Sequence, residues 1–194
     1  MTKINNLILY LLFFLFLHSC SPANILATGA GSGMVIAEGE RSMGTVIDDA
    51  TIKVNISAKF ISSEDNLFIN LSTNVLDGRV LLTGLVDNQE IRIDAVRKVW
   101  EVDGVQEVIN EIQIGNRATL KEYANDLWIN TQVRGLAAKA VGLRMVGYNF
   151  ETIQGKVYIA GITSKPDQLE DLINAVKTVK GVKEIVNYVI IKEK

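Results

Sequence analysis

Apolar and polar positions follow the same order in two long stretches of this 194-residue chain. In residues 49–61 and again in 125–140, apolar side chains return every three or four positions, which predicts a helix in each stretch. Runs that suit half-buried strands come next, followed by a second helical stretch and one more strand. The predicted strands are 67–75, 79–86 and 105–114 in the first stretch, and 144–153, 156–163 and 182–191 in the second.

The two stretches are copies of one unit. When the sequence is shifted by 77 residues against itself, distant positions align without a gap. The aligned pairs include Asp49 with Asp126, Gly78 with Gly155, Gly84 with Gly161, Gly104 with Gly181 and Asn110 with Asn187. This duplication predicts an α+β fold with two units, residues 48–115 and 124–194, each with two helices on a three-stranded mixed sheet. Because each core is small, packing between the units is expected.

Turn and cap residues mark the predicted ends of these elements. Asp77-Gly78 and Gln154-Gly155 are typical of hairpin turns. The second helices are predicted to begin at Asp87, with Glu90 completing a capping box, and at Ser164, with Pro166 in the first turn. Gly104 and Gly181 are predicted to end them. Asp48 and Asp49 are interpreted as caps of the first helix rather than as an acid–base pair.

The first twenty residues are predicted to be a targeting signal. Lys3 precedes an apolar run over 7–17, which is about half the length that a membrane-spanning helix needs. The run ends in Leu17-His18-Ser19-Cys20, which resembles a bacterial lipobox and implies cleavage before an acylated Cys20. Residues 1–19 are then the lipoprotein signal peptide, and the alternative is an ordinary secretory signal with an incidental cysteine. Residues 20–47 are small and weakly charged at their start, as in a flexible tether, and Gly29–Gly33 lacks the context of a phosphate-binding loop.

Composition excludes several classes of chemistry. The hydrophobic content of 48% and charged content of 22% are typical of a globular protein, and the net charge of −2 excludes an overall basic nucleic-acid binder. Cys20 and His18 are the sole cysteine and histidine, so a processed chain cannot build a Cys/His metal cluster or a His-dependent nucleophilic site. We therefore expect a protein that is not an enzyme, with no catalytic residues, no metal site, no cofactor and no small-molecule substrate.

The order of elements, the paired strand glycines and the Val-x-Gly-Val exits at 102–105 and 179–182 resemble the BON domain family. Two such units behind a lipobox, with Asn125-Asp126 and Trp128 opening the second, are similar to lipoproteins with two BON domains. Ser21 after the cysteine resembles lipoproteins sent to the outer membrane. The resemblance implies a lipoprotein on the periplasmic face of the outer membrane. It also implies binding of anionic phospholipid through the first helix of the second unit, in support of envelope integrity and division.

Charge differs sharply between the two units. Residues 48–115 hold 6 Lys and Arg against 12 Asp and Glu, a net of −6, whereas residues 116–194 hold 12 against 8, a net of +4. A cationic residue near an anionic leaflet contributes about 1 kcal/mol. The second unit is therefore the one suited to such a membrane. Simple solvation of the lysines, or attraction between the two units, are the alternatives.

The predicted contact surface surrounds Trp128. On a helical wheel this residue lies away from the predicted core stripe of Ile129, Val133, Leu136 and Ala140, among small and weakly polar side chains. An indole in such surroundings is typical of an anchor at the headgroup level of a membrane. Packing of Trp128 on the first unit or the linker is the alternative. The candidate phospholipid-binding residues are Trp128, Thr131, Gln132, Gly135, Leu136, Ala138 and Lys139.

The other aromatic residues are interpreted as structural. Trp100 is predicted to pack in the core or between the units, and Tyr148, Phe150 and Tyr158 to be core or cross-strand residues rather than a base-stacking platform. We expect no nucleic-acid partner. The alternative function is a protein-interaction or chaperone-like module, in which the acidic first unit binds envelope assembly proteins.

Overall fold

The computed structural model describes residues 42–115, 119–142 and 147–192, all of which belong to one compact unit, Ile36–Lys194. The predicted signal, Cys20 and most of the linker lie outside the described residues. Both hydrophobic cores and both sheets lie inside this unit, so a chain of residues 36–194 retains every described helix and strand. Within the described ranges, no helix combines the length and apolar composition that crossing a bilayer requires.

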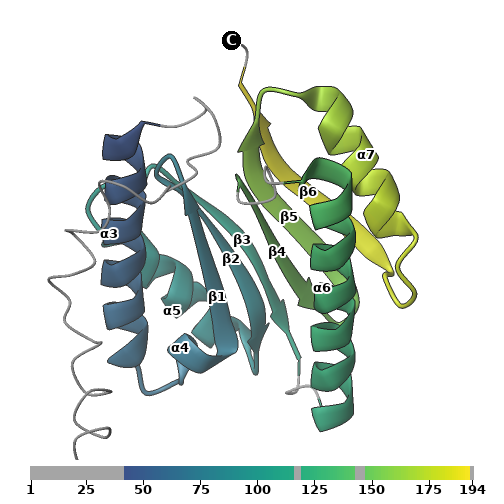
Figure 1. The fold of residues 1–194 in the computed structure, drawn as a ribbon. Coiled ribbons are helices and arrows are strands. Elements are labelled where there is room, and N and C mark those ends of the chain that lie inside the picture. Colours follow the sequence, from purple (N-terminus) through teal and green to yellow (C-terminus); the bar gives the residue numbers. More distant parts are fainter. Residues whose placement is uncertain (1–41, 116–118, 143–146, 193–194) are drawn as a thin grey trace, which may run out of the picture. The chain divides into compact units, whose positions relative to one another are not determined.

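The first repeat consists of three helices and a three-stranded sheet (Figure 1). In the sheet, β2 lies in the middle, antiparallel to β1 and parallel to β3. Apolar residues of α3 and α5, including Ile56 and Val99, pack with strand residues in one core. The elements are α3 (Met43–Ile61), α4 (Leu67–Asn70), β1 (Leu71–Leu76), β2 (Arg79–Val86), α5 (Gln89–Trp100) and β3 (Glu107–Ile114).

The second repeat has the same plan over its described residues, and residues 143–146, which correspond to most of α4, lie outside them. Its sheet again pairs the central strand β5 antiparallel to β4 and parallel to β6. The predicted α+β fold, with a mixed sheet packed on two long helices in each repeat, is confirmed. The elements are α6 (Leu120–Val141), β4 (Tyr148–Ile153), β5 (Lys156–Thr163), α7 (Pro166–Lys177) and β6 (Glu184–Ile191).

Several predicted boundaries were wrong. Residues 67–70 form α4 instead of the start of a strand. The cap of α5 is Asn88, whose side chain accepts a hydrogen bond from Ile91 N at 2.9 Å, so Asp87 and Glu90 form no capping box. The helix α7 is preceded by Lys165 and has no side-chain cap. Gly104 and Gly181 have positive φ angles, as expected, but lie in the turns that follow the helices.

The interpretation of Asp49 as a helix cap was also wrong, and its actual role is more specific. The helix α3 begins at Met43 behind the cap Ser42, so Asp49 lies within the helix. Its two carboxylate oxygens accept hydrogen bonds from Asp77 N at 2.8 Å and Gly78 N at 2.9 Å. In the second repeat, Asp126 accepts the corresponding bonds from Gln154 N and Gly155 N, at 2.7 and 2.9 Å. Each first helix is thus bonded to the hairpin turn of its own repeat.

The outer faces of the two sheets contact each other. Leu76 and Leu81 of the first repeat form a small apolar cluster with Ala160 of the second. Polar side chains surround it: Tyr188 donates to Glu111, Gln113 donates to Tyr158 Oη at 3.1 Å, and Lys192 Nζ lies 2.5 Å from Asp77 Oδ2. The expected packing between the repeats is therefore present, with an apolar centre and a polar rim.

Candidate functional site

The helix α6 carries the predicted membrane-binding surface, and a capping box fixes its start. Thr119 Oγ1 accepts a hydrogen bond from Glu122 N at 3.3 Å, and Glu122 Oε2 accepts one from Thr119 N at 2.7 Å. The backbone bond from Thr119 holds the pKa of Glu122 below its ordinary value. This cap adds a turn and a half before the predicted start at residue 125.

The buried stripe of α6 differs slightly from the predicted one. Ile129, Val133, Ala137 and Val141 are buried, at a spacing of four residues, whereas Ala140 is exposed. Leu136 is half-buried and packs against the core, so its prediction as a surface contact residue does not fit its position. The stripe lies almost opposite Trp128 on the helix.

The other predicted contact residues share one exposed surface of α6. Trp128 is 48% exposed, and the five residues grouped with it are exposed as well. Gly135 and Ala138 on the same surface have no bulky side chain that could cover the ring. We call this surface the α6 outer face; it consists of Trp128, Thr131, Gln132, Gly135, Ala138 and Lys139.

Lys139 is the cationic residue of the α6 outer face. The turn after α7 packs against the buried stripe of α6, because a Cβ on Gly181 would lie 3.0 Å from Ile129 Cδ1. Lys180 and Lys183 are exposed in this turn, and Lys183 Nζ donates to Gln154 O at 2.9 Å.

The remaining aromatic predictions had mixed outcomes. Tyr148, Phe150 and Tyr158 are buried, as expected of core and cross-strand residues. Trp100 is 52% exposed at the end of α5, so the prediction that it packs in the core or between the repeats was wrong. The two tryptophans are therefore matched in exposure but lie on repeats of opposite net charge.

Sequence reasoning missed Tyr123 and Leu127, which are large exposed residues of α6. Tyr123 precedes the predicted start of the helix, so it was not considered as a helical residue. The Thr119-x-x-Glu122 capping signature was present in the sequence and would have placed it correctly.

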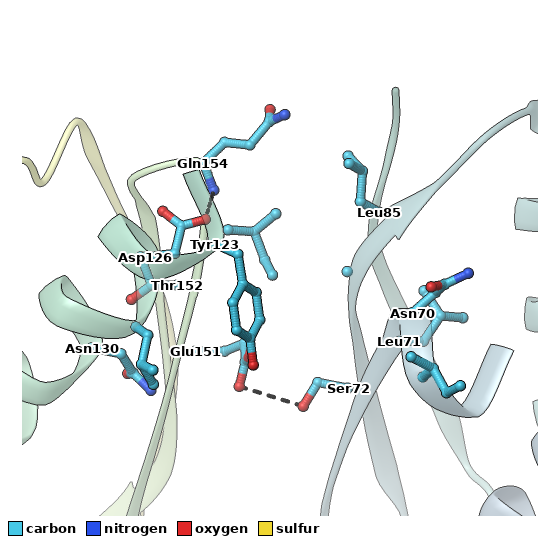
Figure 2. A pocket seen from close by; sticks show the side chains of 14 residues that line it. Asn70, Leu71, Ser72, Leu85, Tyr123, Asp126, Asn130, Glu151, Thr152 and Gln154 are labelled. Carbon is cyan, nitrogen blue, oxygen red and sulfur yellow. Dashed lines mark hydrogen bonds between the residues drawn. The ribbon is translucent and has the colours of Figure 1, made fainter. Parts of the chain in front are cut away.

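Both missed residues line a pocket of about 530 Å³ between the start of α6 and the strand edges of both repeats (Figure 2). This volume is typical of small-molecule sites. Residues 69–72 and Leu85 of the first repeat form one side, and residues 151–153 of β4, with Gln154 of the turn after it, contribute to the other. Among the described residues, no group of His, Cys, Asp and Glu side chains could hold a metal ion.

Glu151 is a carboxylate of this pocket whose pKa is shifted. Burial raises the pKa of its carboxyl group, although a hydrogen bond from Ser72 and the nearby charge of Arg134 oppose the shift. Ser72 Oγ lies 3.4 Å from Glu151 Oε2, so this bond joins the two repeats (Figure 2). The Arg134 guanidinium itself donates to Phe150 O at 3.2 Å.

Comparisons with known proteins agree with the repeated architecture. The BON domain model matches residues 48–116 and 125–193. The chain is 26% identical over 183 residues to outer membrane lipoprotein DolP of Haemophilus influenzae, covering 90% of this chain and 91% of that protein. It is 24% identical over 168 residues to osmotically-inducible protein Y of Escherichia coli, covering 84% and 83%.

A further relative, from Anaplasma centrale, is 37% identical over 147 residues and is described as "Uncharacterized protein in gshII 5'region". The match covers 75% of this chain and 96% of that protein. Because the BON domain model matches each of the two repeats, the chain belongs to the BON domain family, with two BON domains in tandem.

Proposed function

We propose that this protein is an outer-membrane lipoprotein on the periplasmic face, whose second BON domain binds anionic phospholipid through the α6 outer face. In this proposal residues 1–19 are the signal, acylated Cys20 is the anchor, and residues 20–47 are a tether to the folded unit. The Haemophilus influenzae relative, an outer membrane lipoprotein by name, matches this chain over most of its length, which supports the localisation. The protein would then support envelope integrity and division.

The exposure of Trp128 in the cationic repeat is the observation that carries the proposal. An indole places its apolar rings at the membrane interface and keeps its N–H hydrated. About half of a tryptophan side chain is on the order of 100 Å², and transfer of that area from water contributes about 2.5 kcal/mol. This corresponds to more than a tenfold change in affinity, by the rule that about 1.4 kcal/mol is tenfold.

Electrostatic attraction adds to this insertion. Lys139 is exposed on the α6 outer face, and Lys180 and Lys183 are exposed elsewhere on the same repeat. Each contributes about 1 kcal/mol near an anionic surface, and salt screens the attraction beyond about 10 Å at 0.1 M ionic strength. Binding should therefore require both the ring and the anionic headgroups, and it should weaken as salt is added.

Sedimentation with vesicles tests the proposal on the chain of residues 36–194, which lacks Cys20. We expect binding to phosphatidylglycerol vesicles, loss of binding at high salt, and no binding to phosphatidylcholine vesicles. Trp128→Glu should weaken binding at least about tenfold. Trp100→Glu is the matched control, because Trp100 is equally exposed but lies on the acidic repeat, and it should bind as the unaltered chain does. Equal binding by Trp128→Glu, or equal binding to phosphatidylcholine, would contradict the proposal.

A second candidate function has one specific observation in its favour. Ile47, Val54 and Ile61 are exposed on α3 at intervals of seven residues, which places them in a row along one side of the helix. Such a row on the acidic first repeat is a surface that an envelope assembly protein or an unfolded client could contact. Crosslinking in intact cells distinguishes the two functions. Val54→Glu should then remove the crosslinked partners, while Trp128→Glu should leave them unchanged.

A further inference from the structure

The pocket between the two repeats contains buried polar atoms that no group of the described chain satisfies. Asn130 Oδ1 and Thr152 Oγ1 are both completely buried and have no hydrogen-bond partner among the described residues. Both residues line the pocket, from α6 and β4 respectively, and Thr152 is 5% exposed (Figure 2). A buried polar atom without a partner costs about 1–3 kcal/mol, and a ligand in the pocket offsets this cost only if the side chain turns toward it, since neither atom is open to the pocket.

The pocket also has a consistent charge. Asp126 and Glu151 line it, and none of its described lining residues is a lysine or arginine. The two carboxylates differ in the hydrogen bonds that they already accept. Asp126 uses both oxygens to accept bonds from Gln154 N and Gly155 N, so it belongs to the turn. Glu151 accepts the long bond from Ser72 on one oxygen, which leaves it the carboxylate suited to an incoming donor.

The charged group that the pocket offers is therefore an acceptor, Glu151, whereas the Asn130 amide and the Thr152 hydroxyl can each donate or accept. A primary ammonium has three N–H donors and no acceptor, and its positive charge complements Glu151. An anionic headgroup lacks these donors and this positive charge, and the negative charge of Glu151 would repel it.

The rest of the lining is apolar and belongs to both repeats. Ile69, Leu71 and Leu85 come from the first repeat, and Leu127 and Ile153 from the second. The ring of Tyr123 lies beside Glu151 in the pocket (Figure 2). Such walls suit an alkyl chain, and the face of an aromatic ring also attracts a cation.

We propose that this pocket is a binding site for an alkylammonium ligand, whose head is received by Glu151 and whose chain lies along Ile69, Leu85 and Leu127. Because residues of both repeats line the site, the ligand would also join the two BON domains. The site is separate from the α6 outer face, since Trp128 does not line the pocket.

Calorimetric titration of the chain of residues 36–194 with octylammonium, below its micellar concentration, tests the assignment. We expect one saturable site. Octanol, which keeps the chain and loses the charge, should bind at least about tenfold more weakly, and octanoate should not bind. Equal affinity for octanol or octanoate would show a merely apolar or unselective cavity and would overturn the proposal.

Three variants locate the site. Glu151→Gln keeps the shape of the side chain and should weaken octylammonium binding about tenfold or more. Glu170→Gln, an exposed carboxylate on α7, is the matched control and should bind unchanged. Trp128→Glu should also bind unchanged, so failure of vesicle binding and failure of this site can be told apart. Octylammonium should shift the NMR signals of Asn130 and Thr152; unchanged signals, or full affinity in Glu151→Gln, would refute the assignment.

Discussion

Replacement of Asp49 by alanine tests whether the bond between the first helix and the hairpin turn is a main source of stability. Asp49 is 5% exposed, and its carboxylate accepts two backbone bonds, from Asp77 N and Gly78 N. Removal of the side chain leaves two N–H donors without this acceptor, one of them buried. At about 1–3 kcal/mol for each unsatisfied donor, and less where water can enter, we expect a loss of about 3 kcal/mol in the free energy of unfolding.

Thermal unfolding followed by circular dichroism measures this loss. For a cooperative unit of about 150 residues, 3 kcal/mol corresponds to a fall in Tm of about 6 to 12 °C. Asp126→Ala removes the equivalent bonds from a more exposed carboxylate, so its effect should be smaller, about 1 to 2 kcal/mol. Asp48→Ala is the control, since this neighbouring carboxylate is exposed, and it should change stability by less than about 0.5 kcal/mol. If Asp49→Ala and Asp48→Ala melted together, the assigned role of Asp49 would be wrong.

Two further predictions concern a close backbone contact and a buried carboxyl group. A Cβ at Gly84 would lie 2.3 Å from Asn70 O at a φ of +138°, so Gly84→Ala should lower the free energy of unfolding by more than about 2 kcal/mol in urea titrations. Gly135→Ala, where the α6 surface is open, should instead raise it by about 0.5 to 1 kcal/mol, and equal effects of the two changes would contradict the assigned contact. Burial raises the pKa of the Glu151 carboxyl group above its ordinary 4.5, so the folded state binds this proton more tightly than the unfolded state does. The stability that the bound proton contributes is therefore lost as pH rises through the raised value. The stability of Glu151→Gln relative to the unaltered chain should therefore be greater at pH 7 than at pH 4 in urea titrations. A difference independent of pH would show that the folded state does not bind the Glu151 proton more tightly.

The repeated architecture could be predicted because both copies carry the same signals. The central strands were predicted with the bounds that the structure shows, 79–86 and 156–163, because each begins directly after a turn glycine. The failure at 67–70 has a physical reason: Leu67 to Asn70 is too short an apolar run for its periodicity to distinguish a helix from a strand. The starts of α3 and α6 were predicted too late because Ser42 and the Thr119–Glu122 capping box were not considered as caps.

The candidate sites differ in how far sequence could reach them. The α6 outer face was predictable, because it lies on one helix and follows from helical geometry once Trp128 is placed. The pocket was not predictable, because its lining comes from four separate segments, near residues 70, 85, 127 and 152, that only tertiary folding brings together. Asp49 was misinterpreted for the same reason, since its partners lie 28 and 29 residues away in the chain.

The contact between the two sheet faces has a consequence for the origin of this protein. A single BON unit of this kind, expressed alone, would leave Leu76 and Leu81, or Ala160 in the other copy, uncovered by the opposite sheet. An ancestor with one unit would meet the same need by self-association into a symmetric dimer. Duplication and fusion of its gene then turn two subunits into one polypeptide, after which each half is free to diverge in charge while their shared seam is retained.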